Sequence, residues 1–220
     1  MDFTPEHIRR ILISVLVLLI SVALHEFGHA FMAHKLGDDT PRRQGRVTLN
    51  PLAHADPIGT LLLPLLGAAT GYGGFGWGKP VQWQPSRVTR KISMSAAKIL
   101  VAVAGPAMNV LLAVVVAAVH AGLLALDVLS PESPINGFLV LAVRINFILF
   151  FFNLLPLPPL DGGHVAQSFV PYRYRDRFDS FAKYAPFVLL ALMLTPQLQI
   201  VFSWPAQYLT VHVYHLFGVS

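Results

Sequence analysis

Three residues that can bind a metal ion and activate water lie within five positions of the chain: His25, Glu26 and His29. In a helix of 3.6 residues per turn, His25 and His29 lie one above the other on the same face, as two ligands of one metal ion must. Glu26 is rotated by about 100° from His25, so it can hold a metal-bound water without occupying the metal. A lone histidine on an apolar helix is ordinarily a core residue. This HExxH spacing, in contrast, is typical of a zinc site with a glutamate as general base.

The three residues lie inside an apolar run, residues 11–33, whose length predicts a membrane-spanning helix. Ionisable groups are costly in such a span, so they are functional by default. The charged residues 6–10 before the run resemble the start of a secretory signal, but the run is too long and lacks a small-residue cleavage site. We therefore expect a first transmembrane helix over about residues 8–36, with the histidine pair toward its C-terminal end.

The composition is that of a multi-pass membrane protein. Of the 220 residues, 55% are hydrophobic and 12% are charged, and the mean hydropathy is +0.60. The chain has no cysteine, so its metal ligands must be His, Asp or Glu, and neither disulfides nor cysteine nucleophiles are possible. The net charge of +5 arises from basic residues in loops beside apolar spans. The positive-inside rule explains such residues, and we expect no nucleic-acid partner.

A second apolar segment, residues 57–70, is too short for an ordinary span and contains two prolines and two glycines. Basic residues lie on both sides of it. If both flanks are cytoplasmic, the segment dips into the membrane and returns. A strand-like piece is expected at residues 47–49 before it, and a glycine-rich stretch, residues 71–81, follows it. That stretch suits either a flexible turn with aromatic anchors or a strand edge to which an extended substrate adds.

Two long spans are expected next, over residues 95–126 and 137–155. The connection between them contains two acidic residues and no Lys or Arg, which places it outside. The first span and the span over residues 137–155 then both run inward. The latter ends at three prolines within four residues, just before Asp161. A catalytic zinc of this kind needs a third protein ligand. Asp161 is consistent with that position, although an ordinary turn aspartate before Gly-Gly is the alternative.

Two other polar residues are candidates for accessory roles. Asn109 lies in an apolar span after a group of small residues, and it should face protein rather than lipid. His54 is expected either to gate the site or bind the open metal position, or to be a loop histidine with a structural hydrogen bond.

Residues 185–217 contain three prolines, a pattern that favours two short spans over one kinked span, with a cytoplasmic C-terminus. The expected fold is an all-α polytopic membrane protein with about five to six transmembrane helices, a re-entrant segment and a short β-like loop near the active site.

The two motifs at residues 25–29 and 153–162 together resemble the site-2 protease family of intramembrane zinc metalloproteases. The resemblance covers about residues 11–165, and residues 46–64 are similar to the compact prokaryotic branch without PDZ or CBS domains. It implies one Zn²⁺ per chain on His25, His29 and Asp161, with Glu26 as the base and Asn153 as a polar aid to the reacting carbonyl. Asn109 is similar to the family's Gly-Pro-x-x-Asn element. One departure is that no helix precedes the HExxH helix.

The resemblance also implies a substrate class and a location. The expected activity is hydrolysis of peptide bonds within or near transmembrane segments of membrane-anchored proteins, as in regulated intramembrane proteolysis. The expected location is the lipid bilayer of a prokaryotic cell membrane, with the active site toward the cytoplasm. We expect residues 1–220 to form one membrane-embedded domain, with a catalytic core over about residues 8–165 and C-terminal helices over about residues 182–218.

Two other functions use the same residues. A membrane metal transporter would use the His/Asp site without hydrolysis. Its path would need polar groups that continue to the far face, and only Ser14 and Ser21 are polar along residues 11–22. A catalytically inactive membrane chaperone or adaptor is the third interpretation, and the presence of all the catalytic groups weakens it.

Overall fold

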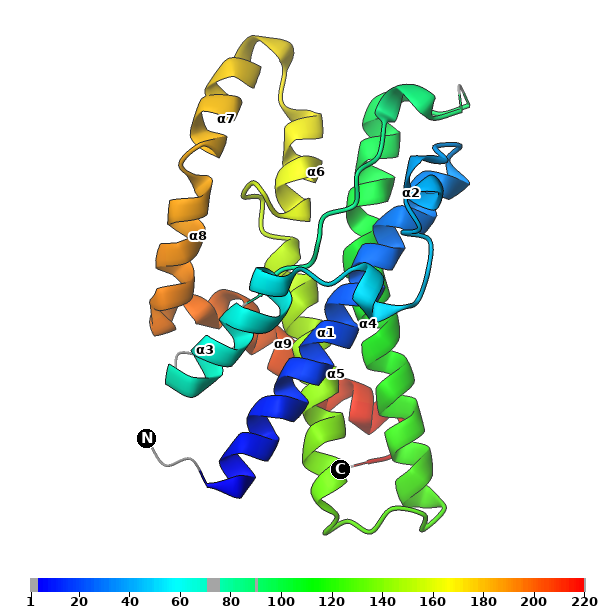
Figure 1. Cartoon of the computed structure of the whole chain (residues 1–220), viewed down its shortest axis with the longest axis vertical. Helices are drawn as coiled ribbons and strands as arrows, with labels where there is room; N and C mark the ends of the chain where they lie inside the picture. Colours follow the sequence, from blue (N-terminus) through cyan, green and yellow to red (C-terminus); the bar gives the residue numbers. More distant parts are fainter. Residues whose placement is uncertain (1–3, 71–75, 90, 220) are drawn as a thin grey trace.

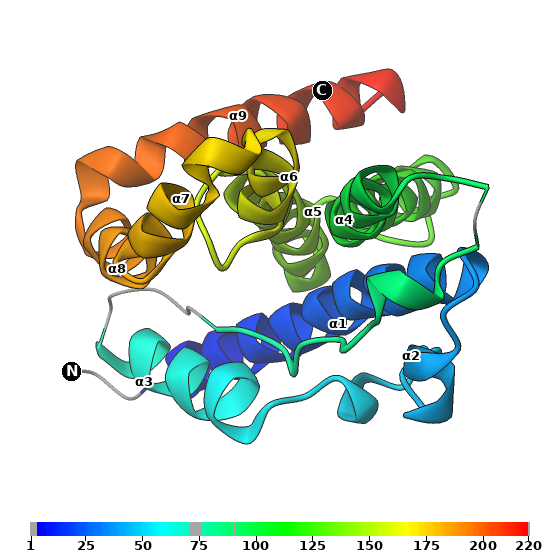
Figure 2. The same ribbon diagram turned by 90° about the horizontal axis from the view of Figure 1, so that it is seen from above.

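Three long apolar helices form the centre of the molecule: α1 (Pro5–Lys35), α4 (Met94–Ala125) and α5 (Pro134–Asn153). The computed structural model describes residues 4–70, 76–89 and 91–219. Each of the three helices is long and apolar enough to cross a membrane. They pack against one another, and α1 is tilted across α4 and α5 (Figures 1 and 2). The three spans expected from the sequence are therefore confirmed to within a few residues.

The ends of these helices are set by local chemistry. Side-chain oxygens of Thr4, Ser93 and Ser133 accept hydrogen bonds from free backbone N–H groups at the starts of α1, α4 and α5. The C-terminus of α1 closes at Gly37, whose φ of +106° is readily adopted only by glycine. The N–H of Asp38 then bonds to Ala33 O at 3.0 Å, which is the Schellman arrangement. The chain therefore leaves α1 two turns after the histidine pair.

Residues 57–70 form a short apolar helix beside α1, made of η2 (Pro57–Leu62) and α3 (Leu63–Thr70). The Asp56 carboxylate caps it by accepting hydrogen bonds from the N–H groups of Ile58 and Gly59. The length of this helix agrees with the expected dipping segment. Before it come two short turns of helix, α2 (Thr40–Arg43) and η1 (Pro51–Ala53).

The β-like loop takes another form, because no strand occurs among the described residues. Residues 47–50, expected to be strand-like, are irregular. Of the glycine-rich stretch, residues 71–75 lie outside the described residues. Residues 76–84, the extended segment, run along α1 (Figure 2), and η3 (Pro85–Arg87) follows them.

The C-terminal part contains α6 (Asp161–Phe169), η4 (Tyr172–Tyr174), α7 (Arg175–Ala182), α8 (Ala185–Leu194) and α9 (Pro196–Leu216). Helix α9 packs across α5 and α4 on the side opposite α1 (Figure 2). Residues 185–217 form two helices that are divided at Thr195, whereas two short spans and a cytoplasmic C-terminus stay predictions. Three helices among the described residues meet the length and hydropathy of a span. The total of five to six spans stays a prediction.

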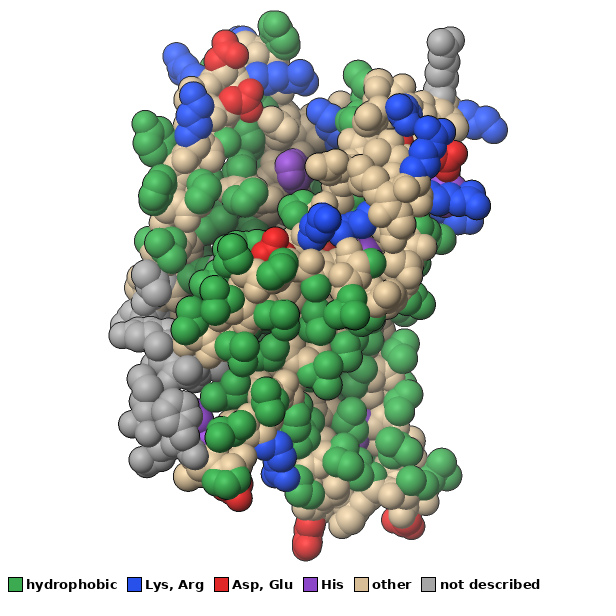
Figure 3. Space-filling model, viewed as in Figure 1, with side chains coloured by type: hydrophobic (Ala, Val, Ile, Leu, Met, Phe, Trp, Pro, Cys, Tyr) green, Lys and Arg blue, Asp and Glu red, His purple; other side chains and the backbone are tan. Residues whose placement is uncertain are grey.

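Charge is distributed unevenly between the two ends of the molecule. Lys and Arg side chains gather over α2, α7 and the start of α4, and hydrophobic side chains cover the surface below them (Figure 3). The connection between α4 and α5 at the other end carries Asp127 and Glu132 and no basic residue. This pattern is that of a protein crossing a bilayer with its basic end on one side.

A buried carboxylate joins the loop after α1 to the extended segment. Asp38, which is completely buried, accepts hydrogen bonds from Thr40 N at 3.0 Å, Thr40 Oγ1 at 2.6 Å and Gln84 N. Burial alone would raise the pKa of Asp38, but these hydrogen bonds favour the charged form and hold the pKa below its usual value. The charged form therefore stabilises the fold here.

We predict that Asp38→Asn lowers the Tm at pH 7 by about 3 to 8 °C, because hydrogen bonds to a charged group contribute about 1.5 to 3 kcal/mol. The folded-state pKa lies below the unfolded value of about 3.9. The contribution is thus complete above about pH 5 and disappears as the pH falls through the folded-state pKa. The measurement is thermal unfolding of the detergent-solubilised protein at several pH values.

The control for this prediction is Asp39→Asn. The Asp39 side chain is 49% exposed and pairs with His34, so its loss should change the Tm little. A Tm difference between Asp38→Asn and wild type that stays the same at low pH would contradict the assigned role of the carboxylate.

Candidate metal centre

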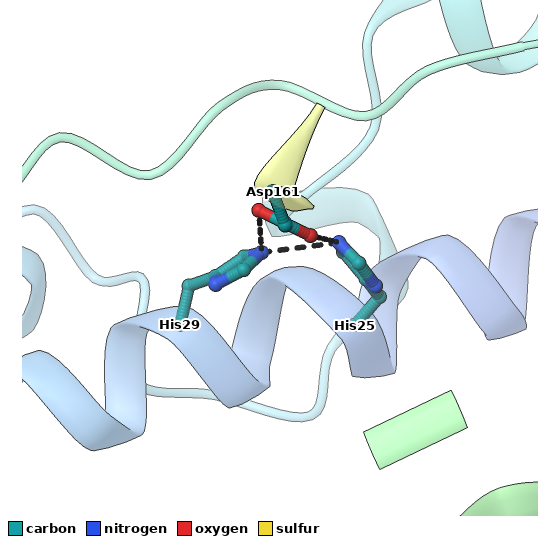
Figure 4. Close-up of side chains that lie close together, drawn as sticks. All are labelled: His25, His29 and Asp161. Carbon is teal, nitrogen blue, oxygen red and sulfur yellow. Dashed lines mark hydrogen bonds and ion pairs between the residues drawn. The ribbon is translucent and has the colours of Figure 1, made fainter. Parts of the chain in front are cut away.

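Residues from two distant motifs converge at one buried point (Figure 4). His25 and His29 project from α1, and Asp161 is the first residue of α6. The Nε2 atoms of the two histidines lie 3.0 Å apart. One carboxylate oxygen of Asp161 lies 3.1 Å from His25 Nε2, and the other lies 3.3 Å from His29 Nε2. One ligand atom from each of the three residues falls within 4.8 Å of the others. The structure thus brings together the three residues expected to bind the metal.

Hydrogen bonds on the far side of each ring fix which nitrogen faces the centre. His29 Nδ1 lies 2.7 Å from the carbonyl oxygen of Val101, which can only accept, so Nδ1 carries the hydrogen. His25 Nδ1 lies 2.7 Å from Asn109 Oδ1 and likewise donates. Both Nε2 atoms therefore present lone pairs to the centre, as metal-binding histidines require.

A buried amide network sets the orientation of Asn109. Its Nδ2 donates to Ser21 O at 3.2 Å and to Asn146 Oδ1 at 3.0 Å, which leaves Oδ1 to accept from His25. Asn146 Nδ2 donates in turn to Ser21 Oγ at 2.9 Å and to Ala142 O at 2.9 Å. Asn109 therefore faces protein, as expected from the sequence, and contacts His25. No role at the site was expected for Asn146 or Ser21, although an amide in the middle of an apolar span is a usable signal.

The donor set fits a metal ion. Two unprotonated imidazole nitrogens and a carboxylate face one another at about hydrogen-bond distance, and Asp161 Oδ2 receives no hydrogen bond from the described residues. Such an arrangement is repulsive unless a cation lies among the three groups. Two His nitrogens and one carboxylate oxygen are a usual protein ligand set of catalytic zinc, which keeps one position open.

Close packing of α1 against α4 depends on small residues beside the histidines. A Cβ added at Gly105 would lie 2.3 Å from His29 Nε2 and 2.8 Å from His25 Cε1. A Cβ at Gly28 would lie 2.5 Å from the carbonyl oxygen of Ala104. Glycine at both positions therefore lets the helices approach closely enough for α4 to support both rings.

Glu26 lies beside the ligands rather than among them. Its Oε2 accepts a hydrogen bond from Val81 N at 3.1 Å, in the extended segment. The segment is held there by hydrogen bonds from Trp77 N to Gly59 O at 3.1 Å and from Lys79 N to His54 O at 2.9 Å. The buried guanidinium of Arg46 donates to Ala53 O and Lys79 O, which ties the loop to this segment. We call His25, His29 and Asp161 together the metal group. Glu26 is thus held next to the metal group by the backbone of the extended segment.

The other two candidates lie in different surroundings. Asn153, the last residue of α5, donates from Nδ2 to Leu149 O at 2.9 Å. His54 is buried, and its Nε2 donates to Thr48 O at 2.9 Å. Burial lowers the pKa of His54, which keeps its ring neutral. His54 is not on the wall of the cavity that contains the metal group, and its contacts are those of the structural alternative.

One cavity of about 1130 Å³ contains the site. Its wall includes His25, Glu26, His29, Asp161 and Asn153, and most of the rest of the wall comes from α1, α4, α5, α6, α8, α9 and the extended segment. The candidate catalytic residues therefore all face one space large enough for several residues of a peptide.

We predict that Asn109→Ala and Asn146→Ala each weaken zinc binding about 10- to 100-fold, the usual effect of losing the partner of a metal-binding histidine. Both changes free the His25 ring to rotate or change tautomer. The measurement is competition for zinc with a chromogenic chelator in detergent. His120→Gln is the control, because His120 is a buried polar residue of α4 that contacts Tyr214 and Asn136 instead. Unchanged zinc affinity in both alanine variants would disprove the positioning role.

Comparison with known proteins agrees with this geometry. The model of peptidase family M50 matches residues 13–130 and 125–196. The chain is 38% identical over 187 residues to a protein named as a zinc metalloprotease, YwhC of Bacillus subtilis, covering 83% of this chain and 80% of the relative. It is also similar to proteins named as the zinc metalloprotease Rip2. The identity is 31% over 185 residues in Mycolicibacterium smegmatis and 33% over 186 in Mycobacterium tuberculosis H37Rv, covering 82% of this chain and 66% of each relative.

No solved structure matches the chain significantly. The family match includes the histidine pair of α1 and Asp161 of α6, and the apolar helices suggest a multi-pass membrane protein. The matched regions and the identity to YwhC together show that the chain belongs to peptidase family M50, the zinc metalloproteases of the site-2 protease type.

Proposed function

We propose that this chain is an intramembrane protease that hydrolyses peptide bonds within or near the transmembrane segments of membrane-anchored proteins. The observation that carries the proposal is the convergence of His25, His29 and Asp161 beside Glu26 in one cavity formed by membrane-length helices. A soluble substrate would not reach a cavity walled by apolar spans, whereas a segment already in the bilayer would.

The chemistry follows from the residues around the cavity. His25, His29 and Asp161 would hold the zinc ion, which when bound polarises the peptide carbonyl and lowers the pKa of water to about 7. Glu26 takes a proton from the attacking water and passes it to the leaving amine. Asn153 has a second amide N–H besides the one bonded to Leu149, and we assign it to the oxygen that becomes negative during attack.

The extended segment offers a place for a peptide main chain. The N–H groups of Trp77, Lys79 and Val81 all point into the protein, where they bond to Gly59, His54 and Glu26. In extended backbone, alternate residues present their main-chain groups to opposite sides. The carbonyl groups of residues 78, 80 and 82 and the N–H groups of residues 78 and 82 are thus directed the other way, where an unwound substrate could add beside them. Pro80 has no N–H and offers only its carbonyl. This supports the strand-edge interpretation of the segment.

The membrane orientation is part of the proposal. The basic end, which the metal group approaches, is placed on the cytoplasmic side of a prokaryotic cell membrane by the positive-inside rule. We propose that the chain works there as one membrane-embedded domain. Metal transport is less well supported, because the cavity wall on α1 between Ser14 and His25 is lined by Val15, Leu18 and Val22.

We predict that Glu26→Gln binds zinc like the wild type but cleaves a single-span model substrate at least about 100-fold more slowly, because the proton acceptor is lost. A zinc chelator should abolish cleavage by the wild type, and added zinc should restore it. Cleavage would be carried out in liposomes and followed by gel electrophoresis, and the metal content would be measured by mass spectrometry.

Glu132→Gln is the matched control, because Glu132 is exposed in the connection between α4 and α5, and its rate should equal that of the wild type. If zinc-loaded Glu26→Gln cleaved at the wild-type rate, Glu26 would not be the base. If the zinc-loaded wild type cleaved none of several substrates, proteolysis would lose its support, and zinc flux into liposomes would test the transporter alternative.

A further inference from the structure

The cavity that contains the metal group continues along α1 to the opposite end of the helix. His7, Arg10 and Ser14 lie on its wall, as do His25 and Glu26. His7 and His25 are separated by five helical turns, which puts them on the same face about 27 Å apart, and Arg10 lies about 22 Å from His25 along the axis. Between Ser14 and His25 the wall on α1 is apolar. One cavity thus has a metal site near one end and basic residues at the other.

Among the described residues, no ion pair neutralises the charge at this remote end. Arg10 is exposed, and no carboxylate lies within ion-pair distance of any Lys or Arg in the described part of the chain. The neighbouring arginine differs: Arg9 lies over the Phe138 ring at 5.9 Å from its centroid and is not on the cavity wall. Arg10 is therefore a cation, with His7 one turn away, directed to a cavity that is otherwise apolar at this end.

We propose that the His7–Arg10 end of the cavity binds an acidic side chain of the substrate, at the membrane boundary remote from the scissile bond. This inference rests on the proposed function and names a substrate class for it. A transmembrane segment lying along α1 with its scissile bond at the metal group would place its apolar body against Val15, Leu18 and Val22. Its far flank would then reach Arg10, where Asp or Glu is the complementary residue.

The distance between the metal group and Arg10 would select substrates by the distance between their scissile bond and their acidic residue. A span of 22 to 27 Å corresponds to about 15 to 18 helical residues, and to fewer where the substrate is unwound near the scissile bond. A substrate with its acidic residue at this distance places its scissile bond at the metal group and its carboxylate at Arg10 at the same time. One with the acid much closer would bury a carboxylate against the apolar wall, which is unfavourable.

The test is binding of a fluorescent single-span peptide that carries either Glu or Gln at the remote flank, with full-length protein in nanodiscs of zwitterionic lipid. The Glu26→Gln background is used, so that loss of cleavage, which tests the proposed function, is not mistaken for loss of acid recognition. We expect the Glu peptide to bind about three- to fivefold more tightly than the Gln peptide, as for a partly exposed ion pair.

Variants of α1 locate the effect. Adding Arg10→Gln should bring the affinity ratio of the two peptides to about 1, whereas Arg9→Gln should leave the ratio unchanged. Arg10→Glu should reverse the preference and favour a peptide with Lys at the flank. Moving the Glu along the flank in the Arg10 protein should give a maximum at one position, which a general effect of surface charge would not produce.

Three results would overturn the proposal. Equal affinity for the Glu and Gln peptides would show that the acid is not recognised. Equal loss of the ratio in Arg9→Gln and Arg10→Gln would show a diffuse charge effect. If anionic lipid abolished the preference, and Arg10 changed only the lipid dependence, the His7–Arg10 end of the cavity would bind lipid phosphate instead of substrate.

Discussion

The hydrogen bond between His25 and Asn109 is the contact on which the metal centre depends. It fixes the tautomer that presents Nε2 to Asp161, and it exists only because Asn109 has no freedom to turn. The amide is held from α1 through Ser21 and from α5 through Asn146, so three membrane-length helices meet at one side chain. Since unsatisfied polar groups are costly in an apolar core, the same network that orients the ligand also fixes how α1, α4 and α5 pack.

The parts of the site that depend on local sequence could be predicted, and those that depend on long-range contacts could not. Helical periodicity alone places His25 above His29, and the shared direction of two spans brings Asp161 to the same end. An amide in the middle of an apolar span marks Asn146 as a buried polar group, but neither its partner nor the role of Val101 could be predicted, because a hydrogen bond between distant helices leaves no spacing in the sequence. Both follow only once the helix packing is known.

The fold shows the same limit. Apolar length identified the three spans because a bilayer imposes a length on each helix. The strand-like piece at residues 47–49 is irregular, because strand propensity describes a pleated, half-buried surface and this segment has no paired neighbour in the described residues. His54 had two expected roles, and the structure gives it the contacts of the structural role: its ring donates to Thr48 and its carbonyl accepts from Lys79.

The position of the metal group along α1 accounts for how water and an apolar substrate can share one cavity. His29 lies six residues before the end of α1, or about 9 Å, while His25 lies about 30 Å from the other end of the helix. Toward the basic end the cavity wall includes Lys98, His164 and Gln167, which can hydrogen-bond water. Between His25 and Ser14 the wall on α1 carries aliphatic side chains, which cannot. Water therefore has a short polar route to Glu26, and the long apolar part of the cavity is available to the substrate that we propose.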